Sequence, residues 1–146
     1  MTMSIDLLPT IAALTGAALP SDRVIDGKNI RDVMQGGGDT PHEHLFFFNG
    51  NDVAAVRDAR FKLVLNAYYK SFYVPFEQFG GMLLFDLEND PQERFSFVRE
   101  NPDSVADLKA AVNQMRLDVA DFVIEPVNPL APRPADTPVG PQLTTP

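Results

Sequence analysis

The fold of this chain is decided by residues 44–65, which read HLFFFNGNDVAAVRDARFKLVL. Three apolar runs, at 44–48, 53–57 and 61–65, are separated by two short polar stretches that have the composition of tight turns. In the third run, Phe61, Leu63 and Leu65 alternate with Lys62 and Val64, as in a strand with one buried face. The stretch therefore predicts a meander of three antiparallel strands.

A fourth strand and a long helix are predicted farther along the chain. Residues 82–87 have the pattern of a strand, and turn-forming residues follow at 88–91. Asn101 and Pro102 favour a helix start, and apolar residues then recur every three or four positions. These apolar positions are Val105, Leu108, Val112, Met115, Val119 and Phe122. The stripe needs an apolar partner, so we predict an α+β fold in which this C-terminal helix packs on a small antiparallel sheet of about four strands.

The remaining segments flank this α+β module. Residues 4–15 predict a short helix, with Asp6 as the N-cap, Gly16 as the stop, and Ile5, Leu8 and Ile11 on one apolar face. We divide the chain into this N-terminal helix (1–16), a connecting loop (17–43), the module (44–123) and a Pro-rich, extended tail (124–146). The tail assignment follows from seven prolines among residues 126–146.

Composition excludes several classes of protein. The chain has 146 residues and a formal net charge of −8, which disfavours a nucleic-acid partner because the phosphate backbone would be repelled. There is no cysteine, so the chain has no disulfide, thiolate metal site or cysteine nucleophile. No apolar run is long enough to cross a bilayer, and the first residues do not form a secretion signal. We therefore expect a soluble domain without a membrane partner.

Two clusters have side chains that could bind a metal. His42 and His44 flank Glu43, but in an extended segment they supply only two ligands on one face, which favours a solvated strand entrance over a zinc site. Asp86, Glu88 and Asp90 suggest a calcium loop, yet the glycine and the later glutamate of such a loop are missing. A strand end followed by a turn is the favoured interpretation there, and we predict no metal ligand in this chain.

Two other clusters could bind an organic or anionic ligand. Residues 68–79 contain six aromatic side chains, which either pack or bind something. Packing is the favoured alternative because large aromatics are mostly buried. Arg57, Arg60 and Lys62 form a basic concentration that could attract an anion, but surface salt bridges with the acidic excess are favoured.

Four segments of the chain, in this order, resemble the C-terminal portion of an arylsulfatase-type sulfatase. They are SIDLLPTIAALTG (4–16), DGKNI (26–30), AVRDARFKL (55–63) and LFDLENDPQE (84–93). The pair Ala-Val-Arg-x-x-Arg-aromatic-Lys-Leu and Phe-Asp-Leu-x-x-Asp-Pro-x-Glu is more specific than either motif alone. The resemblance covers roughly residues 4–120.

The resemblance implies a parent activity of sulfuric ester hydrolysis with a formylglycine nucleophile and a Ca²⁺ ion, both held by a larger upstream catalytic domain. That nucleophile is made from a Cys/Ser-x-Pro-x-Arg motif, and none of the five serines here begins one. The resemblance therefore implies a chain with no catalytic residue and no cofactor of its own, whose partner is the catalytic domain. A free-standing interaction or dimerisation module derived from a sulfatase is the alternative.

The resemblance also implies that residues 68–79 project toward the catalytic domain. Aromatic side chains there could line an aryl- or sugar-sulfate pocket. The candidate substrate-binding residues are Lys62, Tyr68, Tyr69, Phe72 and Tyr73. In some sulfatases a histidine two positions after this lysine reaches the substrate, and here that position is Val64.

Overall fold

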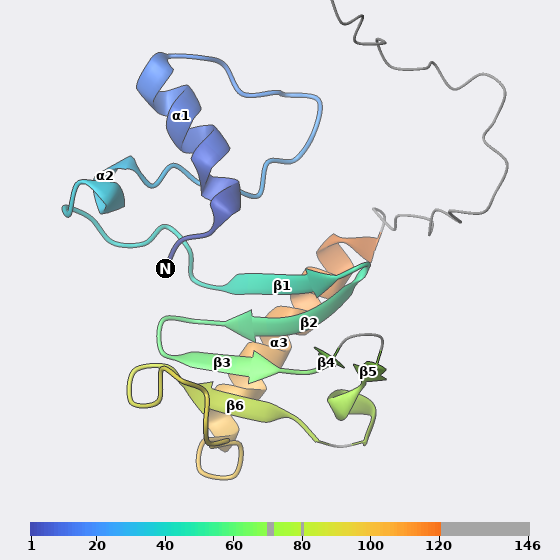
Figure 1. The fold of residues 1–146 in the computed structure, drawn as a ribbon. Helices are drawn as coiled ribbons and strands as arrows, with labels where there is room; N and C mark the ends of the chain where they lie inside the picture. The colour runs from blue at the N-terminus through green and yellow to red at the C-terminus, as the bar shows by residue number, and fades with distance from the viewer. Residues whose placement is uncertain (70–71, 80, 121–146) are drawn as a thin grey trace, which may run out of the picture.

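The computed structural model describes residues 1–69, 72–79 and 81–120 and has an α+β architecture (Figure 1). A 3₁₀ turn and two helices come first, a four-stranded sheet with a small hairpin follows, and a long helix comes last. In chain order the elements are η1 (Ser4–Asp6), α1 (Leu7–Thr15), α2 (Arg31–Met34), β1 (Leu45–Asn49), β2 (Asp52–Arg57), β3 (Phe61–Val64), β4 (Ala67–Tyr69), β5 (Phe72–Val74), η2 (Phe76–Phe79), β6 (Leu83–Asp86) and α3 (Pro102–Asp118).

The main sheet is antiparallel and has the strand order β1-β2-β3-β6. Its first three strands are the predicted meander, and β6 is the predicted fourth strand. The register is irregular between Phe47 and Phe48 of β1, where Ala54 of β2 is left without a partner residue. Beyond the bulge, the Ala54 carbonyl accepts hydrogen bonds from the backbone N–H groups of Leu65 and Asn66 instead.

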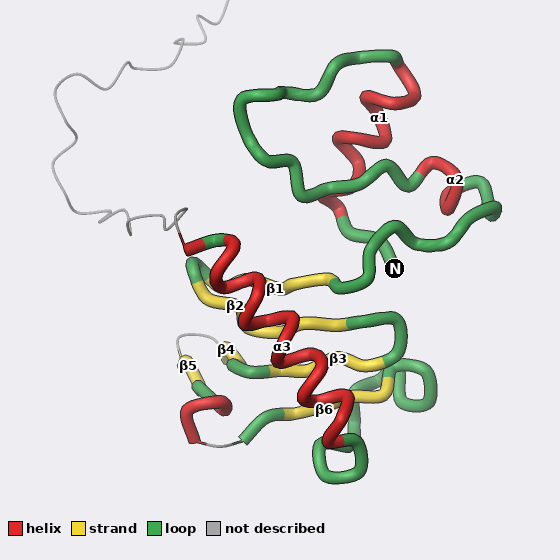
Figure 2. The backbone as a smooth tube through the Cα atoms, turned by 180° about the vertical axis from the view of Figure 1, so that it is seen from behind, coloured by secondary structure: helices red, strands yellow, loops and turns green. Residues whose placement is uncertain are grey.

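Helix α3 covers one face of this sheet, which is the face turned toward the viewer in Figure 2. The predicted stripe positions Val105, Leu108 and Val112 are buried, and they form one cluster with the inward side chains of the strands. Those strand side chains are Val53, Val56, Phe61, Leu63, Leu65 and Leu84. The helix-on-sheet prediction is therefore confirmed, although α3 ends at Asp118 and the predicted stripe residue Phe122 lies outside the described residues.

Pro102 occupies the first turn of α3, as predicted, but Asn101 does not cap it through its side chain. The Asn101 amide instead donates to the Phe97 carbonyl at 3.2 Å. Near the other end of the helix, Arg116 pairs with Glu77 at 2.9 Å and with Asp52 at 3.3 Å. These contacts tie α3 to η2 and to the start of β2.

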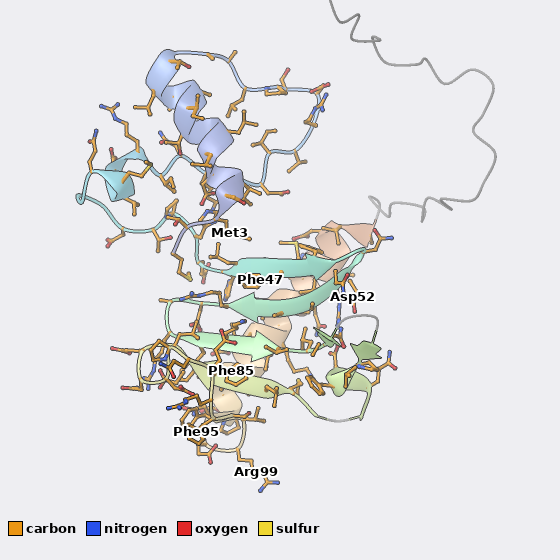
Figure 3. All side chains as sticks on the ribbon, in the orientation of Figure 1. Met3, Phe47, Asp52, Phe85, Phe95 and Arg99 are labelled. Atoms are coloured by element: carbon orange, nitrogen blue, oxygen red, sulfur yellow. The ribbon has the colours of Figure 1, made fainter. Side chains whose placement is uncertain are left out.

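The opposite face of the sheet is only partly covered. Strand alternation places Phe47, Lys62 and Phe85 on it, and Figure 3 shows Phe47 and Phe85 in front of the sheet, away from α3 (Figure 3). Phe85 is buried, whereas Phe47 is 38% exposed. The segment that follows β6 folds across this face beside β3 and β6 (Figure 1).

The aromatic segment forms an element that the sequence pattern did not predict. Strands β4 and β5 make a separate hairpin in which Tyr68 pairs with Tyr73 and Tyr69 with Phe72. Each strand has only three residues, which is too short for alternation to be visible in the sequence.

The N-terminal segment forms the predicted helix but buries a different face of it. Gly16 ends α1 in the left-handed conformation with φ of 74°, as its residue type predicts. Asp6 occupies the N-cap position of α1, as predicted, but its side chain makes no cap hydrogen bond to the helix. The buried residues of α1 are Pro9, Thr10 and Ala12, whereas Leu7, Leu8, Ile11 and Leu14 are 49–57% exposed. We call these four side chains the α1 apolar face.

The predicted connecting loop contains the single helical turn α2, and the predicted Pro-rich tail lies outside the described residues. Within the part of the chain that the structure describes, no helix has the length and apolarity that a bilayer crossing requires.

A paired substitution in α3 tests the packing of the core. Leu108 is 1% exposed and Leu117 is 71% exposed on the same helix. We expect Leu108→Ala to lower the free energy of unfolding by about 2–5 kcal/mol, because it removes buried apolar surface and leaves a cavity. Leu117→Ala should change it by less than about 0.5 kcal/mol. Urea unfolding followed by circular dichroism measures both, and equal losses would contradict the helix orientation.

Candidate functional site

The predicted substrate-binding residues occupy two places in the fold. Lys62 lies near the start of β3, on the sheet face opposite α3, whereas Tyr68, Tyr69, Phe72 and Tyr73 form facing pairs in the β4–β5 hairpin. The hairpin follows the other end of β3 (Figure 1). The structure therefore joins the four aromatic residues in one element and places Lys62 apart from them. The side-chain positions of these four residues are not described.

Lys62 is held by a carboxylate. Its ammonium group donates to both carboxylate oxygens of Glu93, at 2.8 and 2.9 Å, and lies 5.7 Å from the centre of the Phe47 ring. An anionic group that approached Lys62 would have to compete with Glu93 for the same donors. Lys62 is therefore a partly neutralised cation, and its predicted contact with substrate remains a prediction.

The turn after β6 positions Glu93. Asp90 accepts hydrogen bonds through its carboxylate from the backbone N–H groups of Arg94, at 2.7 Å, and Phe95, at 2.9 Å. Glu93 itself has a φ of 53°, a conformation that is costly for a residue with a side chain. The tightly bonded turn holds Glu93 in this conformation and directs it toward Lys62. The sequence motif Asp-Pro-x-Glu contains Glu93, but the motif alone did not show that Glu93 pairs with Lys62.

Asp86 ends β6 and organises the same turn. Its carboxylate accepts from Arg60 at 2.7 and 3.1 Å and from the Asn89 amide at 2.9 Å. The Arg60 guanidinium, followed by Asn89, holds the pKa of Asp86 well below its usual range, and the same pair raises the pKa of Arg60. The prediction of a strand end followed by a turn is therefore confirmed for Asp86 and Asp90.

The prediction of surface salt bridges is confirmed for two of the three basic residues. Arg60 pairs with Asp86 and Lys62 with Glu93. Arg57 makes no ion pair with any residue that the structure describes, and its guanidinium donates instead to the backbone carbonyls of Asp58 and Ala59. Arg57 directly precedes the 58–60 turn, which places these two carbonyl oxygens within reach of its guanidinium.

The two histidines have different surroundings, and a solvated strand entrance is the wrong description of His42. His42 is 7% exposed, and its Nε2 lies 2.7 Å from Oδ1 of Asp6, which is fully buried. Glu43 is exposed and His44 is half-buried. The local alternation could not reveal this contact, because its partner is 36 residues away along the chain.

Asp6 is the centre of a buried polar network. Besides His42, its carboxylate accepts from the backbone N–H groups of Met3 at 2.7 Å and Lys28 at 2.9 Å. Thr10 extends the network, since its hydroxyl donates to the Asp6 carbonyl and accepts from the N–H of Ile30 at 3.0 Å. Burial by itself raises the pKa of Asp6, but the hydrogen bonds from Lys28, Met3 and His42 outweigh it, and the pKa is lowered.

The described residues contain no group of three or more His, Asp or Glu side chains that could hold a metal ion. A Ca²⁺ ion takes six to eight oxygen ligands, so these residues do not fit the ion that the sulfatase resemblance implies.

Asp6→Asn tests the network through its dependence on pH. The folded-state pKa of Asp6 is below the usual 3.8, so the ionised carboxylate stabilises the fold above that pH, and this contribution is lost as the pH falls further. We expect the variant to be about 1–3 kcal/mol less stable than the unmodified chain at pH 7, and this difference to shrink as the pH falls below the usual pKa of 3.8. Asp39→Asn, at an exposed position, is the control. A pH-independent difference would contradict the assignment.

Gly27 is required where the connection passes η1. A Cβ atom at this position would lie 2.0 Å from the backbone oxygen of Ile5, far inside van der Waals contact. We expect Gly27→Ala to separate residues 26–30 from Asp6 and to lower the melting temperature by several degrees. Gly37→Ala is the matched control, because nothing lies within 4 Å of the added atom. Similar melting temperatures for the two variants would refute the close approach.

The chain is similar to sulfatases over most of its length. It is 30% identical to arylsulfatase A of Bos taurus, in an alignment that covers 84% of this chain and 27% of the bovine protein. It is 29% identical to arylsulfatase G of Rattus norvegicus, over 83% of this chain and 25% of the rat protein. The chain thus spans about a quarter of these relatives.

The fold is also found in a solved sulfatase. A structure described as a 2-O GAG sulfatase superposes with a TM-score of 0.56 and 21% identity, over 80% of this chain and 25% of that one. Because the sequence identity is only 21%, this structural similarity is evidence for the fold and not for the function. No protein-family profile matches the chain. The sequence relatives and the fold agree, and most of this chain is an arylsulfatase-type sulfatase region.

Proposed function

We propose that this chain is the C-terminal module of a sulfatase whose larger catalytic domain hydrolyses sulfuric esters. The observation that carries the proposal is the extent of the similarity, which covers 84% of this chain but only 27% of arylsulfatase A. The chain also lacks a Cys/Ser-x-Pro-x-Arg motif from which formylglycine could be made. In this proposal the nucleophile and the Ca²⁺ ion belong to the catalytic domain. The alternative of a free-standing interaction module gains no support from these relatives.

The polar groups of this module are suited to structure rather than to catalysis. Hydrolysis of a sulfate ester needs an activated oxygen nucleophile, positive charge to stabilise the developing oxyanions, and an acid for the leaving group. Here the cations Arg60 and Lys62 are engaged by Asp86 and Glu93. His42, the buried imidazole, is engaged by Asp6. The module would contribute to a sulfatase by shaping the rim of its active site.

The α1 apolar face is the surface through which we propose that the module packs on the catalytic domain. Leu7, Leu8, Ile11 and Leu14 lie along one side of α1, opposite the buried Pro9 and Ala12. An apolar stripe of this kind on a surface helix normally faces another apolar surface. The polar network at Asp6 anchors the other side of the helix, so the stripe would be presented to the partner in a fixed orientation.

The hairpin aromatics and Lys62 are the residues that we propose for substrate contact in the assembled enzyme. Tyr68, Tyr69, Phe72 and Tyr73 could present ring faces to the apolar part of a sulfate ester. Lys62 could contribute positive charge if Glu93 were displaced.

An activity assay tests the proposal that this chain has no catalytic nucleophile of its own. Purified residues 1–146 should release no product from 4-nitrocatechol sulfate, with or without Ca²⁺, because the chain has no residue that can become formylglycine. The genomic sequence before the Met1 codon should encode a Cys/Ser-x-Pro-x-Arg motif in the same frame, and the longer product should hydrolyse the ester. Turnover by residues 1–146 that survives replacement of His42 and His44 would overturn the proposal, as would an upstream in-frame stop codon.

The packing surface has its own test. Without the catalytic domain, the α1 apolar face should bind a hydrophobic dye and promote self-association. We expect Leu8→Ser with Ile11→Ser to reduce both, with little change in the circular dichroism of the sheet. Ala13→Ser, at an exposed position of the same helix, is the control. A monomeric unmodified chain that binds no dye, measured by sedimentation and fluorescence, would contradict this assignment.

A further inference from the structure

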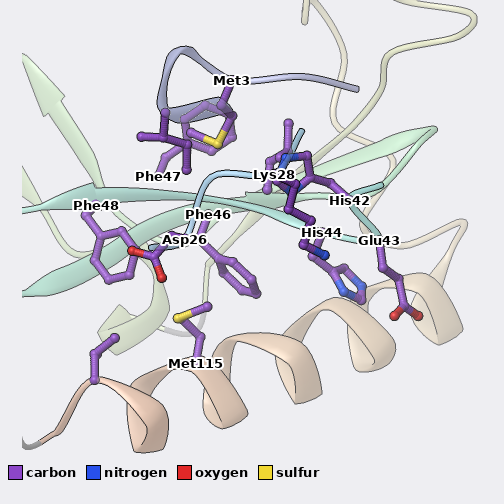
Figure 4. A pocket seen from close by; sticks show the side chains of 13 residues that line it. Met3, Asp26, Lys28, His42, Glu43, His44, Phe46, Phe47, Phe48 and Met115 are labelled. Carbon is purple, nitrogen blue, oxygen red and sulfur yellow. The ribbon is translucent and has the colours of Figure 1, made fainter. Parts of the chain in front are cut away.

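A pocket lies between the N-terminal segment, β1 and the end of α3 (Figure 4). Its volume is about 670 Å³, which is within the range of small-molecule sites in proteins. The walls are mainly apolar, with Phe46 and Phe48 from β1, Met115 and Val119 from the α3 end, and Met3 and Ile5 from the N-terminal segment. Unlike the substrate-binding residues proposed above, this pocket does not involve the β4–β5 hairpin.

Some of the polar side chains that line the pocket already make hydrogen bonds within the chain, and others make none among the described residues. The Lys28 ammonium donates to the Pro41 carbonyl at 2.8 Å, and His42 is bonded to Asp6. Asp26 and Glu43 have no hydrogen-bond or ion-pair partner among the residues that the structure describes. In Figure 4 the Asp26 carboxylate points into the space that Phe46, Phe48 and Met115 also line (Figure 4). The hydrogen bond of Lys28 to a neutral carbonyl leaves its positive charge in place, so the charges on these three lining side chains are two carboxylates, Asp26 and Glu43, against one ammonium, and their balance is negative.

This combination of walls and charge identifies one class of ligand. Aromatic rings attract a cation over their faces, and methionine thioethers adapt to the shape of an apolar group. A free carboxylate adds direct charge complementarity, and it repels a sulfate or another anion. The net charge of −8 on the whole chain acts in the same direction.

We propose that this pocket binds an organic cation with an apolar body, such as a protonated or quaternary aromatic amine. Asp26 faces the positive group, and Phe46, Phe48 and the two methionines enclose the apolar part. The inference does not rest on sulfatase activity, because it concerns a site whose free charge disfavours sulfate esters.

The test uses the full chain with ¹³C-methyl methionine and two aromatic probes of opposite charge. Benzyltrimethylammonium should shift the Met3 and Met115 methyl signals, with a dissociation constant on the order of a few millimolar. Toluenesulfonate should shift them much less. Met34, which is 66% exposed and does not line the pocket, is the internal reference. Asp26→Asn should weaken binding of the cation by about two- to fivefold, whereas Asp39→Asn, which removes a carboxylate outside the pocket, should leave the affinity unchanged.

Three outcomes would overturn the proposal. Equal or stronger binding of toluenesulfonate would show that charge does not select the ligand. If Asp26→Asn left the affinity for the cation unchanged, with the Met34 signal and the melting temperature preserved, Asp26 would not be the carboxylate that binds the cation. Shifts of Met3 and Met115 on dilution of the protein without any probe would show that a second copy of the chain fills the pocket.

Discussion

The apolar face of the four-stranded sheet is the constraint on which most of this structure depends. Val56, Leu63 and Leu84 lie side by side on adjacent strands and are fully buried, and they form one core cluster with the buried side chains of α3. Side chains of this size contribute about 1.5–3 kcal/mol each when they are fully buried. The length and position of α3 follow from this requirement, and the Arg116 contacts to Glu77 and Asp52 tie the helix to the surrounding elements.

The N-terminal segment is held by a different force. Asp6 is a fully buried carboxylate, which would be costly if its hydrogen bonds were not made. The backbone N–H groups of Met3 and Lys28 and the ring of His42 satisfy it, so three distant parts of the chain converge on one side chain. Gly27 permits this convergence because a larger residue would collide with Ile5. The segment is therefore joined to the strand entrance by polar bonds rather than by an apolar core.

The apolar core under α3 and the polar network at Asp6 determine which side chains remain on the surface for a partner or a ligand. The polar network occupies one side of α1 and leaves the α1 apolar face outward, which suits packing on a larger domain. Lys62, on the open face of the sheet, is neutralised by Glu93, and Arg60, in the turn before β3, is neutralised by Asp86 at the end of β6. Asp26 and Glu43, which make no ion pair among the described residues, lie at the pocket beside β1, so the surface proposed for a partner domain and the pocket proposed for a cation differ in chemistry.

The sequence by itself determined the parts of the fold that depend on local periodicity. Alternation at Phe61, Leu63 and Leu65 and the stripe through Leu108 and Val112 predicted the sheet and α3, because burial repeats with the geometry of each element. The family motifs also marked the sulfatase region. Only the tertiary structure showed that Asp6 meets His42, that Glu93 meets Lys62, and that α1 turns Leu8 and Ile11 outward. Such pairings join residues far apart along the chain, and their partners are set by how the elements pack rather than by the spacing of neighbouring residues.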